Sequence, residues 1–402
     1  MIKKINTDQI KVGMYIHDLN CGWMDHSFLK NHFAIRDDRT IRKIWDAGIK
    51  EVYIDTERGD DVRDGQTEDE VNASLDRRML EIAAQVQEAD GHVSLVEEVH
   101  RARRLHAEAN RVVRNLMEDV RLGKQIELEK VEPMVENVAD SVFRNPSALL
   151  PMAMLKSHDN YTFEHSVSVC ALMVAFSREM DLPRDVILRI AVGALLHDLG
   201  KAQISDEILN KPGKLTDEEF IIMKEHAIHS VRLLSNMQGI TSVELEVAGQ
   251  HHERFDGSGY PHCLIGESIS LYGQMAAIVD VYDAISSDRV YHKGLSPTRS
   301  LKKILEWSDH HFNPALVQKF IRSIGIYPSG TLVRLDSGRL GVVIQQKEKN
   351  ILEPLVRIFY NGRQNYYIQP EIIDLSKTHD RVVSCEDYEK WNIDPKQWIS
   401  PG

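Results

Sequence analysis

The strongest constraint on the fold of this chain is a group of histidine and carboxylate side chains that interrupts apolar segments of its middle part. The clearest case is residues 195–201, where His197 and Asp198 end a leucine-rich helical run and Gly200 can terminate the helix. One such pair is weak evidence, because a lone helical histidine is usually structural and an aspartate near a helix end is usually a cap. Further side chains of this kind follow along the chain: His165, His226, His251, His252 and Asp280.

The complete set of seven side chains predicts a metal centre. Several imidazoles and two carboxylates on apolar helices carry a large desolvation cost unless a cation compensates them. A carboxylate has two oxygens and can bridge two cations, so Asp198 suits a dinuclear centre that the other six side chains complete. Nitrogen and oxygen donors without a thiolate favour iron or manganese, although zinc, nickel or cobalt could also bind. Two divalent metal ions are therefore expected.

Changes of sequence pattern divide the 402 residues into four predicted parts. Residues 1–62 mix short β-like runs with a helix and predict a small α+β module. Residues 63–146 have a charged helical pattern and predict a helical connector. Residues 147–327 are mostly amphipathic helices and hold the candidate chemistry, whereas residues 328–402 alternate as strands do. The expected fold class is multidomain and mainly α, with a β-rich C-terminal module.

Within the predicted connector, two rows of residues recur every seven positions, as in the seam of a coiled coil. The pattern predicts either a homodimer through residues 92–122 or a helix that packs on the next domain of the same chain. Both interpretations stay open, because the seam lasts only about three to four heptads and contains alanine and histidine. The two rows are Leu95, Ala102, Ala109 and Leu116, and Val99, His106, Val113 and Val120.

Charge and cysteine usage narrow the partners and the compartment. A formal net charge of -12 argues against a broad attraction to DNA or RNA phosphates, which requires clustered lysine and arginine. The first residues lack the apolar run of a signal peptide, and no stretch is apolar for long enough to predict a membrane span. The four cysteines lie far apart, which predicts reduced thiols. We expect a cytoplasmic location, without nucleic acid or membrane as a partner.

Longer motifs surround the candidate ligands. They are His-His-Glu-Arg-Phe-Asp-Gly-Ser-Gly-Tyr-Pro at 251–261 and Asp-Val-Tyr-Asp-Ala at 280–284, followed by Ser-Asp-Arg-Val-Tyr at 287–291. With the pair His197-Asp198 and Gly200-Lys201, they resemble the HD-GYP subfamily of the HD metal-dependent phosphohydrolases over residues 155–326. The resemblance implies an all-α bundle that hydrolyses cyclic di-GMP to linear pGpG, in some members onward to GMP, with a hydroxide that bridges the metals.

The resemblance also implies roles for individual residues. It assigns one metal to His165, His197, Asp198 and Asp280, and the other to Asp198, His226, His251 and His252. Asp198 and Lys201 would be catalytic, and the phosphates would be contacted by Lys201, Arg289 and Lys293. The loop beside the dinucleotide would be shaped by Gly257, Gly259, Tyr260 and Pro261.

The chain departs from the family pattern at one informative position. Members with three metals have a glutamate four residues before the first histidine ligand, and Tyr161 stands there in this sequence. The departure predicts two metals rather than three. The N-terminal module and connector resemble an uncharacterised domain that often precedes HD-GYP domains in bacterial proteins, and this second resemblance implies no chemistry.

Two alternative functions remain open from the sequence. Within enzymes, the substrate could be cyclic GMP-AMP, or a nucleoside monophosphate as in generic HD hydrolases, because base selection depends on a binding surface that the motifs do not define. In another class, the chain would be a catalytically silent receptor of a cyclic dinucleotide. The complete set of seven ligands argues against a silent receptor, which would tolerate their loss.

Overall fold

The computed structural model describes residues 1–22, 28, 31–85, 95–154, 161–211, 213–287, 294–347, 350–393 and 396–399. The chain forms two compact units, and each is described here by itself. The smaller unit comprises Met1–Arg78 and Asp206–Met223, and the larger unit comprises Met79–Ser205 and Lys224–Gly402.

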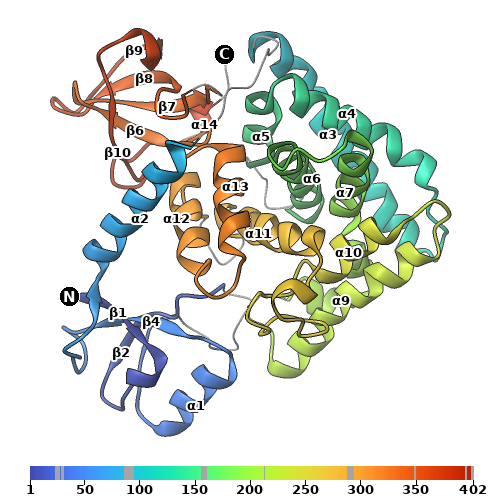
Figure 1. Ribbon diagram of the computed structural model, residues 1–402, viewed down its shortest axis with the longest axis horizontal. Coiled ribbons are helices and arrows are strands. Elements are labelled where there is room, and N and C mark those ends of the chain that lie inside the picture. Colours follow the sequence, from blue (N-terminus) through green and yellow to red (C-terminus); the bar gives the residue numbers. More distant parts are fainter. Residues whose placement is uncertain are drawn as a thin grey trace. The chain divides into compact units, whose positions relative to one another are not determined.

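A five-stranded antiparallel sheet with the strand order β3-β2-β4-β1-β5 forms the smaller unit, together with one helix from the same part of the chain (Figure 1). Ile16, Val52 and Ile54 are fully buried in its core. Asp37 caps the start of helix α1, because its carboxylate accepts a hydrogen bond from the Thr40 backbone N–H. The elements are β1 (Ile2–Asn6), η1 (Thr7–Gln9), β2 (Tyr15–Asp18), β3 (Phe33–Ala34), α1 (Asp38–Asp46), β4 (Glu51–Asp55) and β5 (Gln66–Thr67).

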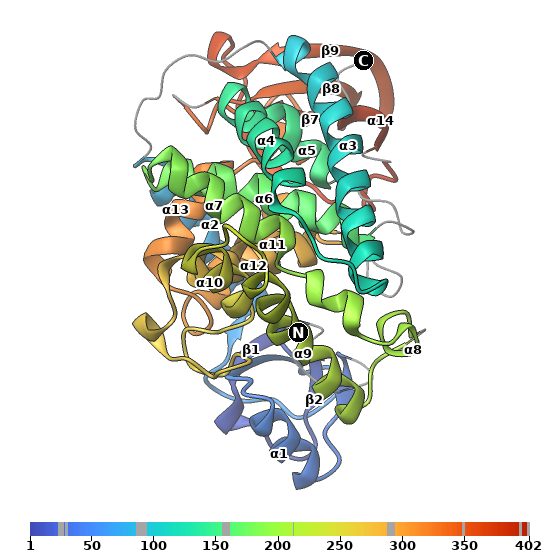
Figure 2. The ribbon, with the colours of Figure 1, turned by 90° about the vertical axis from the view of Figure 1, so that its right-hand side faces the viewer.

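The larger unit is a helical bundle around α6 (Tyr161–Glu179), which contacts α3, α4, α5, α7, α11 and α13 (Figures 1 and 2). A helix that is covered on most sides must be apolar around most of its circumference, and Val167, Cys170 and Phe176 are all fully buried. The other helices are α3 (Leu95–Arg121), η2 (Leu128–Lys130), α4 (Glu132–Arg144), α5 (Pro146–Met154), α7 (Arg184–Leu196), η4 (Leu199–Gln203), α10 (Ser242–Gln250), η5 (Gly266–Ser268), α11 (Leu271–Ser286), α12 (Pro297–Trp307) and α13 (Pro314–Ile324).

Three helices involve the smaller unit as well. Helix α2 (Glu68–Ala83) passes from the smaller unit into the larger one, and α8 (Asp206–Leu209) belongs to the smaller unit. Helix α9 (Asp217–Ser235) begins in the smaller unit and continues in the larger one, where it carries His226. The segment that precedes a predicted metal ligand is thus grouped with the N-terminal sheet, although the sequence pattern placed it inside the helical domain.

The apolar rows of the predicted connector are covered within the chain. Helix α3 packs against α4, α5, α6 and η4, and Ala102 and Ala109 are completely buried there. Small residues at these positions allow close approach of the neighbouring helices. The heptad pattern therefore describes packing inside this chain, and dimerisation through residues 92–122 stays a prediction without support from an open seam.

The C-terminal part of the larger unit is a five-stranded antiparallel sheet with the strand order β10-β6-β7-β8-β9. Apolar residues are buried on both faces of this sheet: Val343, Val356 and Ile358 belong to one core cluster, and Val342 and Phe359 belong to another. The elements are β6 (Leu332–Leu335), β7 (Arg339–Gln345), β8 (Leu355–Asn361), β9 (Tyr366–Asp374), η6 (Leu375–Lys377), β10 (Val382–Cys385) and α14 (Lys396–Ile399). The predicted fold class, mainly α with two small modules, is confirmed.

No helix in the described parts of the chain combines the length and the apolar character that a bilayer span requires.

A buried ion pair joins α3 to α4, and we expect its removal to destabilise the bundle. Glu98 is fully buried and accepts two hydrogen bonds of 2.8 Å from the Arg144 guanidinium and one of 2.9 Å from Ser141. Truncating one partner of a buried pair costs about 3–5 kcal/mol, and we expect about 2–4 kcal/mol for Glu98→Ala because Arg144 remains partly exposed. Chemical unfolding at pH 7 measures this loss.

The same pair should make stability depend on pH. Burial alone would raise the pKa of Glu98, but hydrogen bonds from Arg144 and Ser141 outweigh it and hold the pKa below its usual value. The contribution is therefore complete above the pKa of the unfolded carboxyl group and is lost as the pH falls through the lower folded pKa. The difference in free energy of unfolding between wild type and Glu98→Ala should therefore become smaller in acid. Glu127→Ala, which breaks an exposed pair with Lys130, should cause neither the loss of stability nor its dependence on pH. An equal loss of stability in Glu98→Ala at pH 7 and pH 3 would contradict this role of the ion pair.

Candidate metal centre

The seven predicted ligands lie together in the larger unit, although they come from helices spread over more than a hundred residues. His165 is on α6, His197 ends α7, His226 is on α9, and Asp280 is on α11. His197, Asp198, His226 and His251 are at most 1% exposed, so the group is withdrawn from solvent. Of the remaining three members, Asp198 follows His197 at the start of η4, and the other two sit beside each other at and after the end of α10: His251 and His252.

The two carboxylate oxygens of Asp198 face two different sets of imidazoles. Oδ2 lies 3.4 Å from His197 Nε2 and 3.6 Å from His165 Nε2. Oδ1 lies 3.4 Å from His226 Nε2 and 3.9 Å from His251 Nε2. One carboxylate thus stands between two donor groups, which is the arrangement that a bridge between two cations requires.

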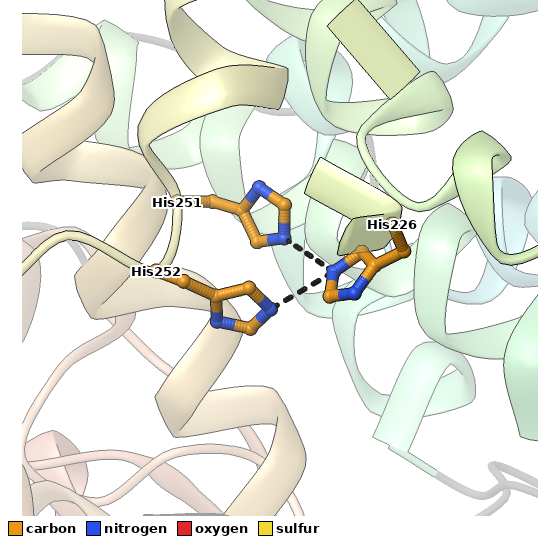
Figure 3. Close-up of side chains that lie close together, drawn as sticks. All are labelled: His226, His251 and His252. Carbon is orange, nitrogen blue, oxygen red and sulfur yellow. Dashed lines mark hydrogen bonds between the residues drawn. The ribbon is translucent and has the colours of Figure 1, made fainter. Parts of the chain in front are cut away.

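Each donor group is compact enough to surround one ion. In the first, His165 Nε2 lies 3.0 Å and His197 Nε2 lies 3.8 Å from Asp280 Oδ1. In the second, His226 Nε2 lies 3.4 Å from His251 Nε2 and 3.1 Å from His252 Nε2, and the three rings converge on one point (Figure 3). The structure therefore brings together the two ligand sets that the family resemblance implies.

Backbone carbonyls fix which nitrogen of two ring systems is free to bind a cation. His197 Nδ1 donates to the Ala194 carbonyl at 2.8 Å, and His251 Nδ1 donates to the Ala248 carbonyl at 2.8 Å. Both histidines occupy the residue after a helix, where the carbonyl three residues earlier lacks a helical partner. The helix ends therefore leave Nε2 of each ring directed at Asp198.

Two buried atoms of the site have no hydrogen-bond partner in the described part of the chain: His197 Nε2 and Asp198 Oδ1. A buried polar atom without a partner costs about 1–3 kcal/mol, so such atoms call for an explanation. A divalent cation at each donor group would satisfy both atoms. The residues present therefore fit two metal ions, which agrees with the predicted donor chemistry.

The protonation states of most ligands also suit cations. Burial, and then the charge on His197, lowers the pKa of His251 to about 3, and burial together with His251 holds the pKa of His252 well below its usual value. Burial opposes ionisation of Asp198, but Lys201 and His197 hold its pKa well below its usual range. His197 is the exception: despite burial, Asp198 raises its pKa, so cation binding would release a proton there.

The loop after α10 lies directly beside the second donor group. The Tyr260 ring stacks on the His252 imidazole with a centroid distance of 4.6 Å, and the Lys224 ammonium of α9 lies 5.1 Å from the Tyr260 ring centroid. An aromatic ring thus lies next to His252, and an ammonium group lies next to that ring. Of the predicted loop residues, Tyr260 contacts a candidate ligand, His252, and Pro261 follows it in the same loop.

A buried carboxylate holds this loop in place. Glu253 is 1% exposed and accepts hydrogen bonds from the backbone N–H groups of His262 at 2.7 Å and Leu264 at 2.9 Å. At Gly259, a Cβ atom would lie 2.3 Å from the Arg254 nitrogen, so only glycine fits against this turn. Gly257 has a positive φ of 82°, which glycine adopts without strain.

Of the three residues predicted to contact the phosphates, one lies among the described residues. Lys201, on η4, lies with its ammonium 2.5 Å from Asp198 Oδ2, which places a fixed positive charge at the edge of the site. Arg289 and Lys293 lie outside the described residues. Their predicted phosphate contacts stay predictions.

Comparison with known proteins decides the family. Residues 2–131 match the domain of unknown function DUF3391, and residues 150–316 match the HD domain. A cyclic di-GMP phosphodiesterase of Pseudomonas aeruginosa is 38% identical over 396 residues, which cover 98% of this chain and 94% of that protein. The chain belongs to the HD-GYP family.

Two further comparisons are with a relative that matches a smaller share of this chain and with a solved structure that superposes less closely. A 3′3′-cGAMP-specific phosphodiesterase of Vibrio cholerae is 37% identical over 149 residues, which are 37% of this chain and 34% of that protein. The solved structure of an HDGYP protein from Bdellovibrio bacteriovorus aligns with a TM-score of 0.46 at 15% identity, covering 80% of this chain and 98% of that one.

Sequence reasoning missed one residue that orients a ligand of this HD-GYP protein. Asp283 Oδ2 accepts a hydrogen bond of 2.6 Å from His165 Nδ1, and its other oxygen accepts one from the Ser168 hydroxyl. The carboxylate is 1% exposed and fixes His165 with Nε2 toward Asp280 and Asp198. Its spacing was the available signal, because a residue three positions after Asp280 lies on the same helix face.

We expect Asp283→Ala to weaken metal binding by roughly 10–100-fold, because partners that orient a ligand typically contribute that much. Equilibrium dialysis against manganese or iron, followed by metal analysis, measures the affinity. Ser286→Ala is the matched control, since it removes only a 3.2 Å hydrogen bond to the Asp283 backbone carbonyl on the same helix. Wild-type metal affinity in Asp283→Ala would show that His165 is oriented by its packing alone.

Proposed function

We propose that this chain is a phosphodiesterase that hydrolyses cyclic di-GMP to linear pGpG with two divalent ions held by the seven ligands. The observation that carries the proposal is the position of Asp198, whose two oxygens face two separate donor groups. The name of the Pseudomonas relative, which matches nearly the whole chain, supports cyclic di-GMP as the substrate.

The residues of the site have different roles. Two bound ions would supply Lewis-acid activation of water and of the phosphate oxygens. Asp198 holds the two donor groups at a fixed separation, and Asp283 keeps His165 in position. Lys201 places a positive charge where the reacting phosphate gains negative charge, which stabilises the transition state more than the ground state.

The loop beside His252 is the proposed contact for the rest of the substrate. Tyr260 presents an aromatic ring, and Lys224 presents a cation next to that ring. A purine can stack on such a ring, and a phosphate can bind the ammonium. Glu253 holds the loop rigid, so these contacts are arranged before the substrate binds.

Iron or manganese is the proposed metal. The donors are five imidazoles and two carboxylates, without a thiolate, and such a set suits these ions, although zinc, nickel and cobalt share part of the preference. Cyclic GMP-AMP is a second candidate substrate, favoured by the cGAMP-specific relative. A silent receptor is disfavoured, because the chain keeps all seven ligands in place.

One experiment tests enzyme, substrate and metal together. The full chain, purified without oxygen and loaded with iron or manganese, is incubated with cyclic di-GMP and with cyclic GMP-AMP in parallel, and the products are separated by chromatography. We expect pGpG to form faster than the product from cyclic GMP-AMP, and a chelator to stop both reactions. If metal-loaded protein turns over neither dinucleotide, the proposed enzymatic function is refuted. Faster turnover of cyclic GMP-AMP would make that dinucleotide, rather than cyclic di-GMP, the preferred substrate.

A further inference from the structure

A cavity of about 480 Å³ lies in the larger unit, away from the metal centre and between the helical bundle and the C-terminal sheet. Helices α5, α6, α11 and α13 and the end of β7 all contribute to its wall. One part of the wall is apolar and includes Leu150, Leu172 and Ile351. The volume falls within the range of cavities that hold small molecules, about 300–1,000 Å³.

The polar part of the wall carries an excess of positive charge. Its described residues include four basic side chains, Arg178, Lys319, Arg322 and Lys347, and two acidic ones, Glu179 and Asp181. Arg322 pairs with Glu179 at 2.9 Å, and Lys347 pairs with Asp374 at 2.5 Å. Lys319 forms no hydrogen bond or ion pair within 4 Å among the described residues, so its ammonium is available to a ligand.

Two polar atoms in this wall are buried without a hydrogen-bond partner among the described residues: the Tyr282 hydroxyl and Gln346 Oε1. Tyr282 is 1% exposed, and its ring packs edge-on against Phe320. The Gln346 amide is oriented, because its Nε2 donates to the Tyr327 carbonyl. Oε1 therefore needs a donor that the described protein does not supply, and Tyr282 can donate or accept.

Tyr282 also separates this cavity from the metal centre. It follows Asp280 by two positions on α11, and a helix turns by about 200° over two residues, so the two side chains leave opposite sides of the helix. Asp280 faces the imidazoles, whereas Tyr282 lines the cavity. A ligand in the cavity would touch the helix that carries Asp280 without touching the donor groups.

We propose that this cavity is a second ligand site that binds a phosphorylated small molecule of nucleoside monophosphate size. A phosphate monoester carries a charge of about −1.5 to −2. The wall keeps an excess of one basic side chain after Asp374, which pairs with Lys347, is counted. Lys319 and Arg178 both line the cavity, and ammonium and guanidinium groups bind phosphate well. The organic part of the ligand packs on Leu150 and Leu172 and supplies a donor to Gln346 Oε1.

Calorimetric titration of the full chain tests the site, with GMP, guanosine and inorganic phosphate as probes. The titration is run on metal-loaded protein and again after chelation, so that binding at the metal centre is separated from binding in the cavity. We expect GMP to bind after chelation, and guanosine and phosphate to bind roughly tenfold or more weakly, since each lacks part of the contacts. GMP binding that disappears with the metal, or guanosine or phosphate binding as tightly as GMP, would overturn the proposal.

Substitutions locate the binding. Lys319→Glu should weaken GMP binding roughly tenfold or more, whereas Lys130→Glu, the same change at an exposed position outside the cavity, should leave it unchanged. Tyr282→Phe should weaken GMP binding several-fold and leave the melting temperature of the unliganded chain unchanged or higher, because it removes an unpaired hydroxyl. Unchanged GMP affinity in Lys319→Glu, or in Tyr282→Phe, would refute the site. These outcomes do not depend on whether the metal centre hydrolyses a dinucleotide.

Discussion

Replacing Asp198 with alanine is expected to abolish turnover of cyclic di-GMP and to remove bound metal from both donor groups. Each of its oxygens faces a different group, so a single substitution affects both. A bound cation supplies several kcal/mol of transition-state stabilisation, which corresponds to a loss of roughly a thousandfold or more in kcat/KM. Initial rates of pGpG formation, normalised to folded protein, measure the effect.

The control for this substitution is at the start of α7, the helix that ends shortly before Asp198. Asp185 is an exposed acid in the first turn of α7, and Asp185→Ala also removes one carboxylate. It should keep wild-type turnover and metal content, with at most a small loss of stability from the helix end. Asp198→Ala that retains more than a tenth of wild-type turnover would show that Asp198 does not bridge the two ions.

Gly200→Ala is expected to cause the second largest effect, although alanine adds only one carbon atom. A Cβ atom at Gly200 would lie 2.1 Å from the His226 carbonyl oxygen and 2.6 Å from the Ser230 nitrogen. Both are backbone atoms of α9, so no side chain can rotate away to make room. The added atom must push η4, which carries Lys201, away from the helix that carries His226.

We expect Gly200→Ala to lose roughly 3 kcal/mol or more of stability, at the upper end of the cost of overpacking, because backbone must move. Metal content should fall as well, since the separation of Asp198 from His226 would increase. Ser230→Ala separates volume from hydrogen bonding, because it removes only the 2.8 Å bond that its hydroxyl accepts from the Gly200 N–H. Melting curves and metal analysis of both variants provide the test, and a Gly200→Ala protein no less stable than Ser230→Ala would contradict this packing.

The seven candidate ligands, which lie together in the structure, could be selected from the sequence because each is chemically unusual where it stands. His197 and Asp198 end an apolar helix, and His251 and His252 follow another, so the cost of burying them pointed to cations. The resemblance then divided the set into two groups. Which oxygen of Asp198 faces which group depends on the packing of five elements and could not be derived from residue spacing.

Other features depended on tertiary contacts that a sequence does not display. The heptad rows on α3 have the same pattern whether they pack on a partner or on α5 and α6, and only the fold distinguishes the two. Likewise, nothing in residues 206–223 indicates that they group with the N-terminal sheet rather than with the helix bundle that surrounds them in sequence. Local patterns predicted the elements, whereas contacts between distant segments determined where those elements pack.

If Asp198 holds two metal ions, metal content and turnover should be lost together when it is replaced. Metal analysis by mass spectrometry of the full chain, purified without oxygen and assayed for pGpG formation in the same preparation, tests this most directly. We expect two ions per wild-type chain at full activity and a loss of both ions in Asp198→Ala. Full activity with a single ion per chain, or two ions retained in Asp198→Ala, would contradict this expectation.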